Sequence, residues 1–86
     1  MSRNVKTAET RYIKNEMNRD RAGWAMMALE KFSKETGQNL TTEAEEAIGD
    51  LLCDLGHLCA AKGFDYDLLV SRGREHFTLE AASREF

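Results

Sequence analysis

Residues 42–63 read TEAEEAIGDLLCDLGHLCAAKG and carry the strongest helix signal in the chain. Thr42 followed three residues later by Glu45 is a capping box, in which each side chain accepts a hydrogen bond from the other residue's backbone N–H. Lys62 and then Gly63 form the matching end signal, because a cation suits the negative end of the helix dipole and glycine adopts the left-handed cap without strain. We therefore expect a helix from about Thr42 to Lys62.

An earlier helix is expected from about Thr7 to Thr36, ending before Gly37. Its apolar residues recur at spacings of three, four and seven, as one stripe of a helix requires. Gly23 and the polar run at 18–21 interrupt the stripe, and Asp20 is a suitable N-cap. A break or bend near 19–23 is therefore an alternative to one continuous helix.

A later helix is expected from about Tyr66 to Ala82, with Asp65 as its N-cap. The connection before it is very short, which favours antiparallel packing of the second and third helices. The chain has 86 residues, no proline and 42% apolar residues, so the prediction is one all-α domain, a small three-helix bundle. A core this small gains from an oligomer interface, which favours self-association, with a homodimer expected.

The chain contains no run of about 18 apolar residues and no hydrophobic signal region at its start. We therefore expect a cytoplasmic protein that does not enter a membrane. Cys53 and Cys59 stand six residues apart in one predicted helix, an unfavourable arrangement for a disulfide. Both are expected to be reduced thiols.

The charge is uneven along the chain. Residues 1–21 form a basic N-terminal arm with six Lys or Arg and three acidic residues, although the whole chain has a net charge of −3. A basic arm on an acidic body can bind nucleic acid, and this alternative rests on Arg3, Lys6, Arg11, Lys14, Arg19 and Arg21. The favoured interpretation is a solvated helix end, because these charges are far more dispersed than the basic clusters of nucleic-acid binders.

A helical wheel at about 100° per residue separates the faces of the second helix. Its apolar arc, about 120° wide, predicts a face toward the core and contains Ala44, Ile48, Leu51, Leu52, Leu55, Leu58 and Cys59. Cys53 and His57 lie outside that arc, so Cys53, His57 and Cys59 cannot close a zinc site alone, and their spacing matches no usual zinc pattern. Cys53 and His57 could still supply half of a site, with His76 or a second subunit completing it. No metal ion and no cofactor are predicted.

One flank of the same helix carries a seam of small residues. This seam consists of Gly49, Cys53, Gly56 and Ala60. A glycine within a helix costs about 1 kcal/mol relative to alanine, and close approach of another helix would offset that cost. The neighbour is expected to be either the first helix of the same chain or a partner subunit. The candidate partner-binding residues are this seam and four exposed acids, Glu43, Glu46, Asp50 and Asp54.

Three stretches carry a family resemblance: EAIGDLL at 46–52, KGFDYDLL at 62–69 and RGREHF at 72–77. Together they resemble the later half of MazG-like nucleoside triphosphate pyrophosphatases. That resemblance implies an acidic helix whose Glu-x-x-Asp pair joins a Glu-x-x-Glu pair of an earlier helix to hold Mg²⁺ on the substrate phosphates. Asp50 matches the family's aspartate, but Ala47 replaces the glutamate three residues before it, leaving Glu46. No Glu-x-x-Glu pair occurs in the first helix.

The stretches DLLCDLGHLCAAKGFDYDLL at 50–69 and REHF at 74–77 are also similar to short proteins of bacteriophages and other mobile elements. This second resemblance implies a class of function, the binding of a larger host or viral complex. No complete catalytic or metal-binding set is present in the sequence. We therefore expect a non-enzymatic protein-binding or regulatory module. The alternatives are a degenerate pyrophosphatase with Glu46 and Asp50 as metal ligands, and a nucleic-acid binder.

Overall fold

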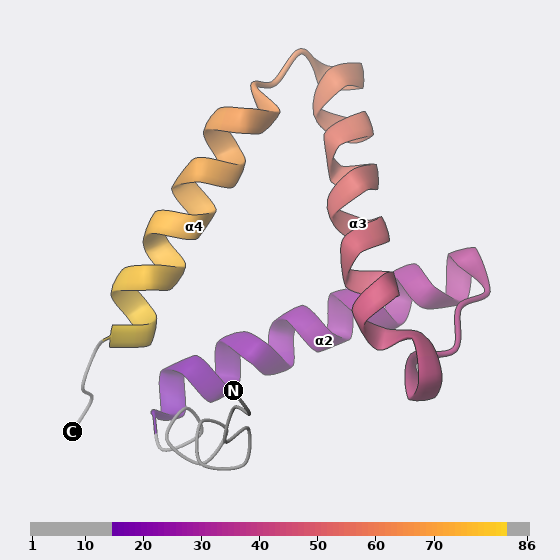
Figure 1. Cartoon of the computed structure of the whole chain (residues 1–86), viewed down its shortest axis with the longest axis horizontal. Coiled ribbons are helices and arrows are strands. Elements are labelled where there is room, and N and C mark those ends of the chain that lie inside the picture. The colour runs from indigo at the N-terminus through magenta and orange to yellow at the C-terminus, as the bar shows by residue number, and fades with distance from the viewer. Residues whose placement is uncertain (1–14, 83–86) are drawn as a thin grey trace, which may run out of the picture.

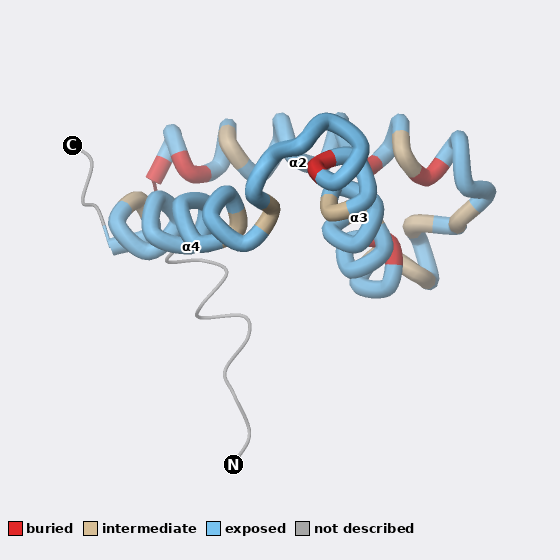
Figure 2. Tube along the Cα trace, turned by 90° about the horizontal axis from the view of Figure 1, so that it is seen from above, coloured by how far each residue is buried: buried red, intermediate tan, exposed pale blue. Residues whose placement is uncertain are grey.

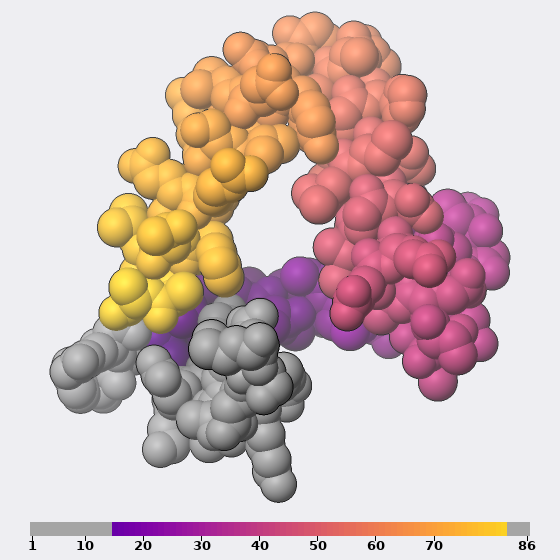
Figure 3. All heavy atoms as spheres, in the orientation of Figure 1, coloured from indigo at the N-terminus to yellow at the C-terminus, as the bar shows by residue number. Residues whose placement is uncertain are grey.

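The computed structural model describes residues 15–82, and within that range it contains three helices and no strand. They are α2 (Glu16–Thr36), α3 (Leu40–Lys62) and α4 (Tyr66–Ala82). The all-α, three-helix prediction is therefore confirmed. The helices form the three sides of an open triangle (Figure 1), and side chains do not fill its centre (Figure 3).

Helix α2 begins at a cap that the sequence analysis did not predict. The Asn15 side chain accepts a hydrogen bond from the Asn18 backbone N–H at 3.0 Å, which satisfies one of the free donors at the helix start. The helix continues without interruption through 19–23, so the alternative with a break there is wrong. It ends at Gly37, whose φ of 77° is the left-handed cap conformation. Thr7 lies outside the described residues, but the extended Asn15 cap shows that no single helix runs unbroken from there to Thr36, so that part of the prediction is wrong.

Helix α3 begins earlier than predicted. The Asn39 side chain accepts a hydrogen bond from the Thr41 N–H at 2.9 Å, and the Glu43 carboxylate accepts one from the Asn39 N–H at 2.9 Å. These reciprocal bonds act as a capping box, so the expected pair of Thr42 and Glu45 is not the one that starts the helix. Glu43 itself departs from helical geometry (φ −127°, ψ 23°), which places a kink after the first turn.

The junction between α3 and α4 has the predicted boundaries and a different geometry. Gly63 has a φ of 73°, and the Asp65 carboxylate accepts a hydrogen bond from the Leu68 N–H at 3.0 Å, as expected of a C-cap and an N-cap. The two helices nevertheless diverge as sides of the triangle (Figure 1), so the predicted antiparallel packing is wrong. Tyr66 stands at the apex, with its ring beside Gly56 and its hydroxyl donating to the Leu52 carbonyl at 2.7 Å.

A polar clasp closes the triangle between the start of α2 and the end of α4. The buried Asn18 amide donates to the Glu80 backbone carbonyl at 2.8 Å. The Arg21 guanidinium donates to the Asn18 side-chain oxygen at 2.7 Å, and it lies 3.5 Å from the Glu80 carboxylate. Asn18 therefore uses both ends of its amide group, and it links two segments 62 residues apart.

The core is small. Leu29, Ala47 and Cys59 are the buried apolar residues within 15–82, which confirms the prediction that Cys59 is a core residue. Most of the described trace is exposed (Figure 2). Most of the other residues predicted to face a core are exposed, because the open triangle supplies no neighbour to cover them. The large exposed apolar residues are Met17, Trp24, Met26, Met27, Ile48, Leu52, Leu55, Leu58, Phe64, Leu68, Leu69, Phe77 and Leu79.

The contact between Tyr66 and Gly56 predicts different effects for two glycine substitutions. A Cβ at Gly23 would meet nothing within 4 Å among the described residues, so Gly23→Ala should raise the free energy of unfolding by about 0.5–1 kcal/mol. A Cβ at Gly56 would lie 3.3 Å from the Tyr66 ring, so Gly56→Ala should give a smaller gain or a loss. Urea denaturation measures both. Equal gains from the two substitutions would contradict the proposed contact.

The clasp predicts a large effect for Asn18. Asn18→Ala removes the donor to the Glu80 carbonyl and the acceptor for Arg21, and should lower the free energy of unfolding by about 1–3 kcal/mol. Amide hydrogen exchange should quicken in the last turn of α4. Arg19→Ala is the matched control, because Arg19 is exposed on the same turn and its loss should change stability by about 0.5 kcal/mol or less. Equal effects of the two substitutions would exclude the clasp as a stabilising contact.

Candidate functional site

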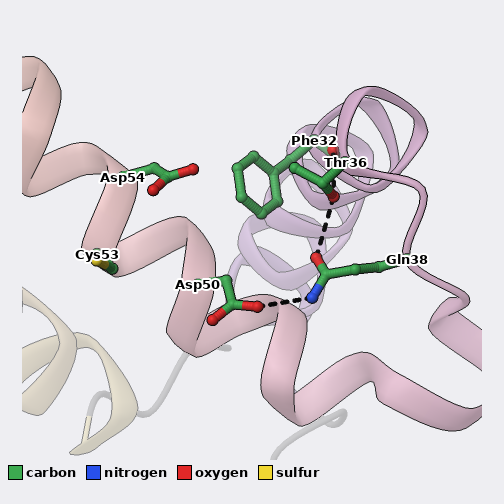
Figure 4. Close-up of a pocket in the computed structure, with 6 residues that line it drawn as sticks. All are labelled: Phe32, Thr36, Gln38, Asp50, Cys53 and Asp54. Atoms are coloured by element: carbon green, nitrogen blue, oxygen red, sulfur yellow. Dashed lines mark hydrogen bonds between the residues drawn. The ribbon is translucent and has the colours of Figure 1, made fainter.

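A hollow of about 290 Å³ lies between the C-terminal end of α2 and the middle of α3 (Figure 4). Its walls combine apolar, amide and acidic side chains. The residues that line it are Phe32, Thr36, Gln38, Asp50, Cys53 and Asp54. Three of them, Asp50, Cys53 and Asp54, are among the residues predicted to bind a partner.

Hydrogen bonds fix the polar side of this hollow. The Gln38 amide donates to the Asp50 carboxylate at 2.7 Å, and the Thr36 hydroxyl donates to the Gln38 amide oxygen at 3.1 Å (Figure 4). Asp50 is thereby tied to the loop that follows α2. Phe32, Thr36 and Gln38 also belong to the site, although their sequence pattern did not predict it. The sequence marks Gln38 as a turn residue after Gly37, but it holds no signal for the acid that Gln38 reaches across twelve residues.

The structure places the four residues of the seam in different surroundings. A Cβ at Gly49 would meet nothing within 4 Å among the described residues, whereas one at Gly56 would touch the Tyr66 ring. Cys53 and Ala60 are exposed. Of the two neighbours expected for the seam, the first helix of the same chain does not lie against Gly49. A partner subunit at that position stays a prediction.

The four acids predicted to bind a partner differ in how far they are engaged. Glu43 caps the start of α3, and Asp50 accepts the hydrogen bond from Gln38. Glu46 and Asp54 are exposed, and Asp54 points into the hollow (Figure 4). The two carboxylates that the pyrophosphatase resemblance offered as metal ligands, Glu46 and Asp50, belong to no cluster of three potential ligands within residues 15–82.

The basic arm is described only in part. Arg3, Lys6, Arg11 and Lys14 lie outside the described residues. Arg19 is exposed, and Arg21 is engaged with Asn18 and Glu80 in the clasp. The described part of the arm therefore offers one exposed arginine and one that already stabilises the fold.

One set of potential metal ligands converges on the surface of α3. Cys53, Asp54 and His57 each offer a ligand atom, and these atoms all lie within 4.8 Å of one another. All three residues are exposed. The sequence spacing identified Cys53 and His57 as a pair one helical turn apart. It did not identify Asp54 as their neighbour, and His76 is not part of the set.

No protein-family model, curated protein or solved structure matches this chain. Within residues 15–82, no helix combines the length and the apolar character that a membrane crossing requires.

The two cysteines should differ in chemical reactivity. Cys53 is exposed and Cys59 is 7% exposed, and both are free. A thiol reagent added to the native protein should modify Cys53 first, and Cys59 should react at a comparable rate only in denaturant, because folding shields it. Mass spectrometry of the labelled peptides measures the two rates. The variant Cys53→Ser should lose the fast reaction, and a fast reaction that persists in this variant would contradict the burial of Cys59.

Proposed function

We propose that this chain is a non-enzymatic, cytoplasmic protein-interaction module that acts as a homodimer and binds a protein partner. The observation that supports this proposal is the exposure of thirteen large apolar side chains against three buried apolar residues in the described range. Large contiguous apolar surfaces on a folded protein mark interaction sites.

The exposed apolar side chains, which are spread over the three helices and the connection between α3 and α4, together hold more area than one standard interface needs. Each of these side chains, when fully covered, removes on the order of 100 Å² from water and contributes roughly 1.5–3 kcal/mol. Each partner in a standard protein interface buries about 800 Å², so eight or so such side chains would be enough. Burial against a second copy supplies the stability that three buried apolar residues leave lacking.

Helix α3 is the best candidate for the centre of this interface. Ile48, Leu52 and Leu55 lie within one apolar arc of its wheel, and they are 50%, 48% and 41% exposed. Gly49 stands next to this arc with open space in front of its backbone, which allows another helix to approach closely. An interface centred here would have an apolar middle, the arrangement found in stable interfaces.

The charge on α3 indicates the chemistry of the protein partner. Between positions 40 and 61 the chain has five acidic residues and no Lys or Arg. They are Glu43, Glu45, Glu46, Asp50 and Asp54. On the helical wheel Glu46 and Asp50 lie on the side of α3 opposite the apolar arc, so a second copy can cover the arc while these acids favour a basic surface on another protein and disfavour nucleic acid. We propose a basic surface on a host or viral complex as the target, in keeping with the resemblance to phage and mobile-element proteins.

The two alternative functions have less support. The pyrophosphatase interpretation requires a second pair of carboxylates near Glu46 and Asp50, and no such cluster occurs within residues 15–82. The nucleic-acid interpretation depends on the basic arm, where Arg21 is engaged in the clasp. The exposed apolar surface has a direct role only in the protein-interaction proposal.

Substitution of Leu52 tests the proposed dimer. The wild-type chain should sediment at twice its 9.8 kDa mass, and Leu52→Lys should weaken the dimer roughly 1,000-fold, because each copy loses a buried leucine worth roughly 2 kcal/mol, about 4 kcal/mol per dimer. Leu52 is half exposed in the single chain, so the substitution should leave the fold intact. Sedimentation equilibrium measures the dissociation constant.

Met27→Lys is the matched control, since Met27 on α2 is 67% exposed and lies outside the α3 surface. It should retain a dimer close to wild type in strength. A wild-type chain that stays monomeric at millimolar concentration would contradict the proposal. If both variants weakened the dimer equally, the interface could not be centred on α3.

A further inference from the structure

Three side chains on α3 form a ligand set whose geometry follows from the helix itself. His57 stands four residues after Cys53 and three after Asp54, so its ring lies on the next turn between the two. The thiol sulfur, a carboxylate oxygen and a ring nitrogen all lie within 4.8 Å of one another. We propose that Cys53, Asp54 and His57 bind a divalent transition-metal ion of the zinc class.

The donor types determine which ion this set prefers. A thiolate and an imidazole are ligands for Zn²⁺, Co²⁺ and related ions, whereas Mg²⁺ and Ca²⁺ take oxygen ligands almost exclusively. The Cys53 thiolate and the Asp54 carboxylate together carry two negative charges, which balance a divalent cation. Three protein ligands leave one position of a tetrahedral ion open to water.

The distances fit such an ion after small side-chain movements. Donor atoms bound to one zinc ion at about 2.0–2.3 Å stand roughly 3.3–3.7 Å apart. The present separations, up to 4.8 Å, therefore close by about 1.5 Å at most through rotation of exposed side chains. No backbone change is needed, because all three residues already lie on one helical face.

The surroundings of the set favour a cation. Between positions 40 and 61 the chain has no Lys or Arg, so no positive charge of α3 within this stretch repels a metal ion. Asp50, one turn before Asp54, adds a further negative charge, and Gln38 holds it in place. The residues that line the adjoining hollow also include no Lys or Arg. The ligands are exposed, so the ion reaches them without opening the fold.

Cobalt provides a direct probe, because a thiolate bound to Co²⁺ gives a charge-transfer band in the near ultraviolet. The reduced full chain, titrated with Co²⁺, should show this band and saturate at one ion per chain, and Zn²⁺ should displace the cobalt while excess Mg²⁺ should not. Cys53→Ser should abolish the band. His57→Gln and Asp54→Asn should each weaken binding at least about 10-fold, since even residues that merely support a ligand contribute that much.

The chain contains a matched control for each main ligand. Cys59→Ala and His76→Gln remove the other cysteine and the other histidine, and both variants should bind Co²⁺ as the wild type does. A Leu52→Ser variant, which removes the same apolar side chain without adding a positive charge beside Cys53, should also bind one ion, which separates this site from the proposed dimer. Circular dichroism checks that each variant is helical. Absence of the band at millimolar Co²⁺, or a band that survives Cys53→Ser and disappears in Cys59→Ala, would overturn the proposal.

Discussion

The closure of the helical triangle between α2 and α4 depends on one buried amide. Asn18 sits in the first turn of α2, and its side chain donates to the backbone carbonyl of Glu80 near the end of α4. A buried polar group must find a partner, because leaving it without one costs about 1–3 kcal/mol. Asn18 finds its partners on α4 and in Arg21, which ties the last helix to the first. The triangle is thus closed by polar contacts at one corner and by Tyr66 at another, with little apolar packing between its sides.

Apolar burial contributes unusually little to the free energy of folding of this chain. Three buried apolar residues supply little of the hydrophobic free energy that normally offsets the entropy of ordering a chain. Hydrogen bonds such as those of Asn18 and Tyr66 contribute about 1 kcal/mol each, which cannot replace a core. Covering the exposed apolar surface would contribute more free energy than these hydrogen bonds. Covering it with a second copy would couple folding to association, so the measured stability would then depend on protein concentration.

The sequence predicted the features that depend on neighbouring residues. Gly37 and Gly63 ended their helices as predicted, and Asp65 capped α4, because each signal acts within one helical turn. The start of α3 was predicted wrongly, since Asn39 and Glu43 compete for the same role as Thr42 and Glu45 and lie closer to the turn.

Features that depend on distant residues were not predictable in this way. The apolar stripe of α3 was expected to face a core, but a stripe shows only that a face needs covering and does not say whether the same chain covers it. At the apex the Tyr66 ring lies beside Gly56, ten residues earlier in the chain, a contact that no local signal in the sequence predicts. In the candidate site, the pairing of Cys53 and His57 followed from their spacing, whereas the contact between Gln38 and Asp50 crosses from one element to the next.

Cys53 belongs both to the proposed dimer surface and to the proposed metal site. It belongs to the seam of small residues, where a second helix would approach, and it belongs to the ligand set with Asp54 and His57. A metal ion bound to its sulfur adds volume and neutralises negative charge on the flank of α3. If a second copy packs against the seam, the ion and the partner therefore act on the same side chain, and each must change the affinity for the other by the same factor. Helix α3 would then carry both the apolar surface that binds the second copy and a metal site that changes the affinity of that binding.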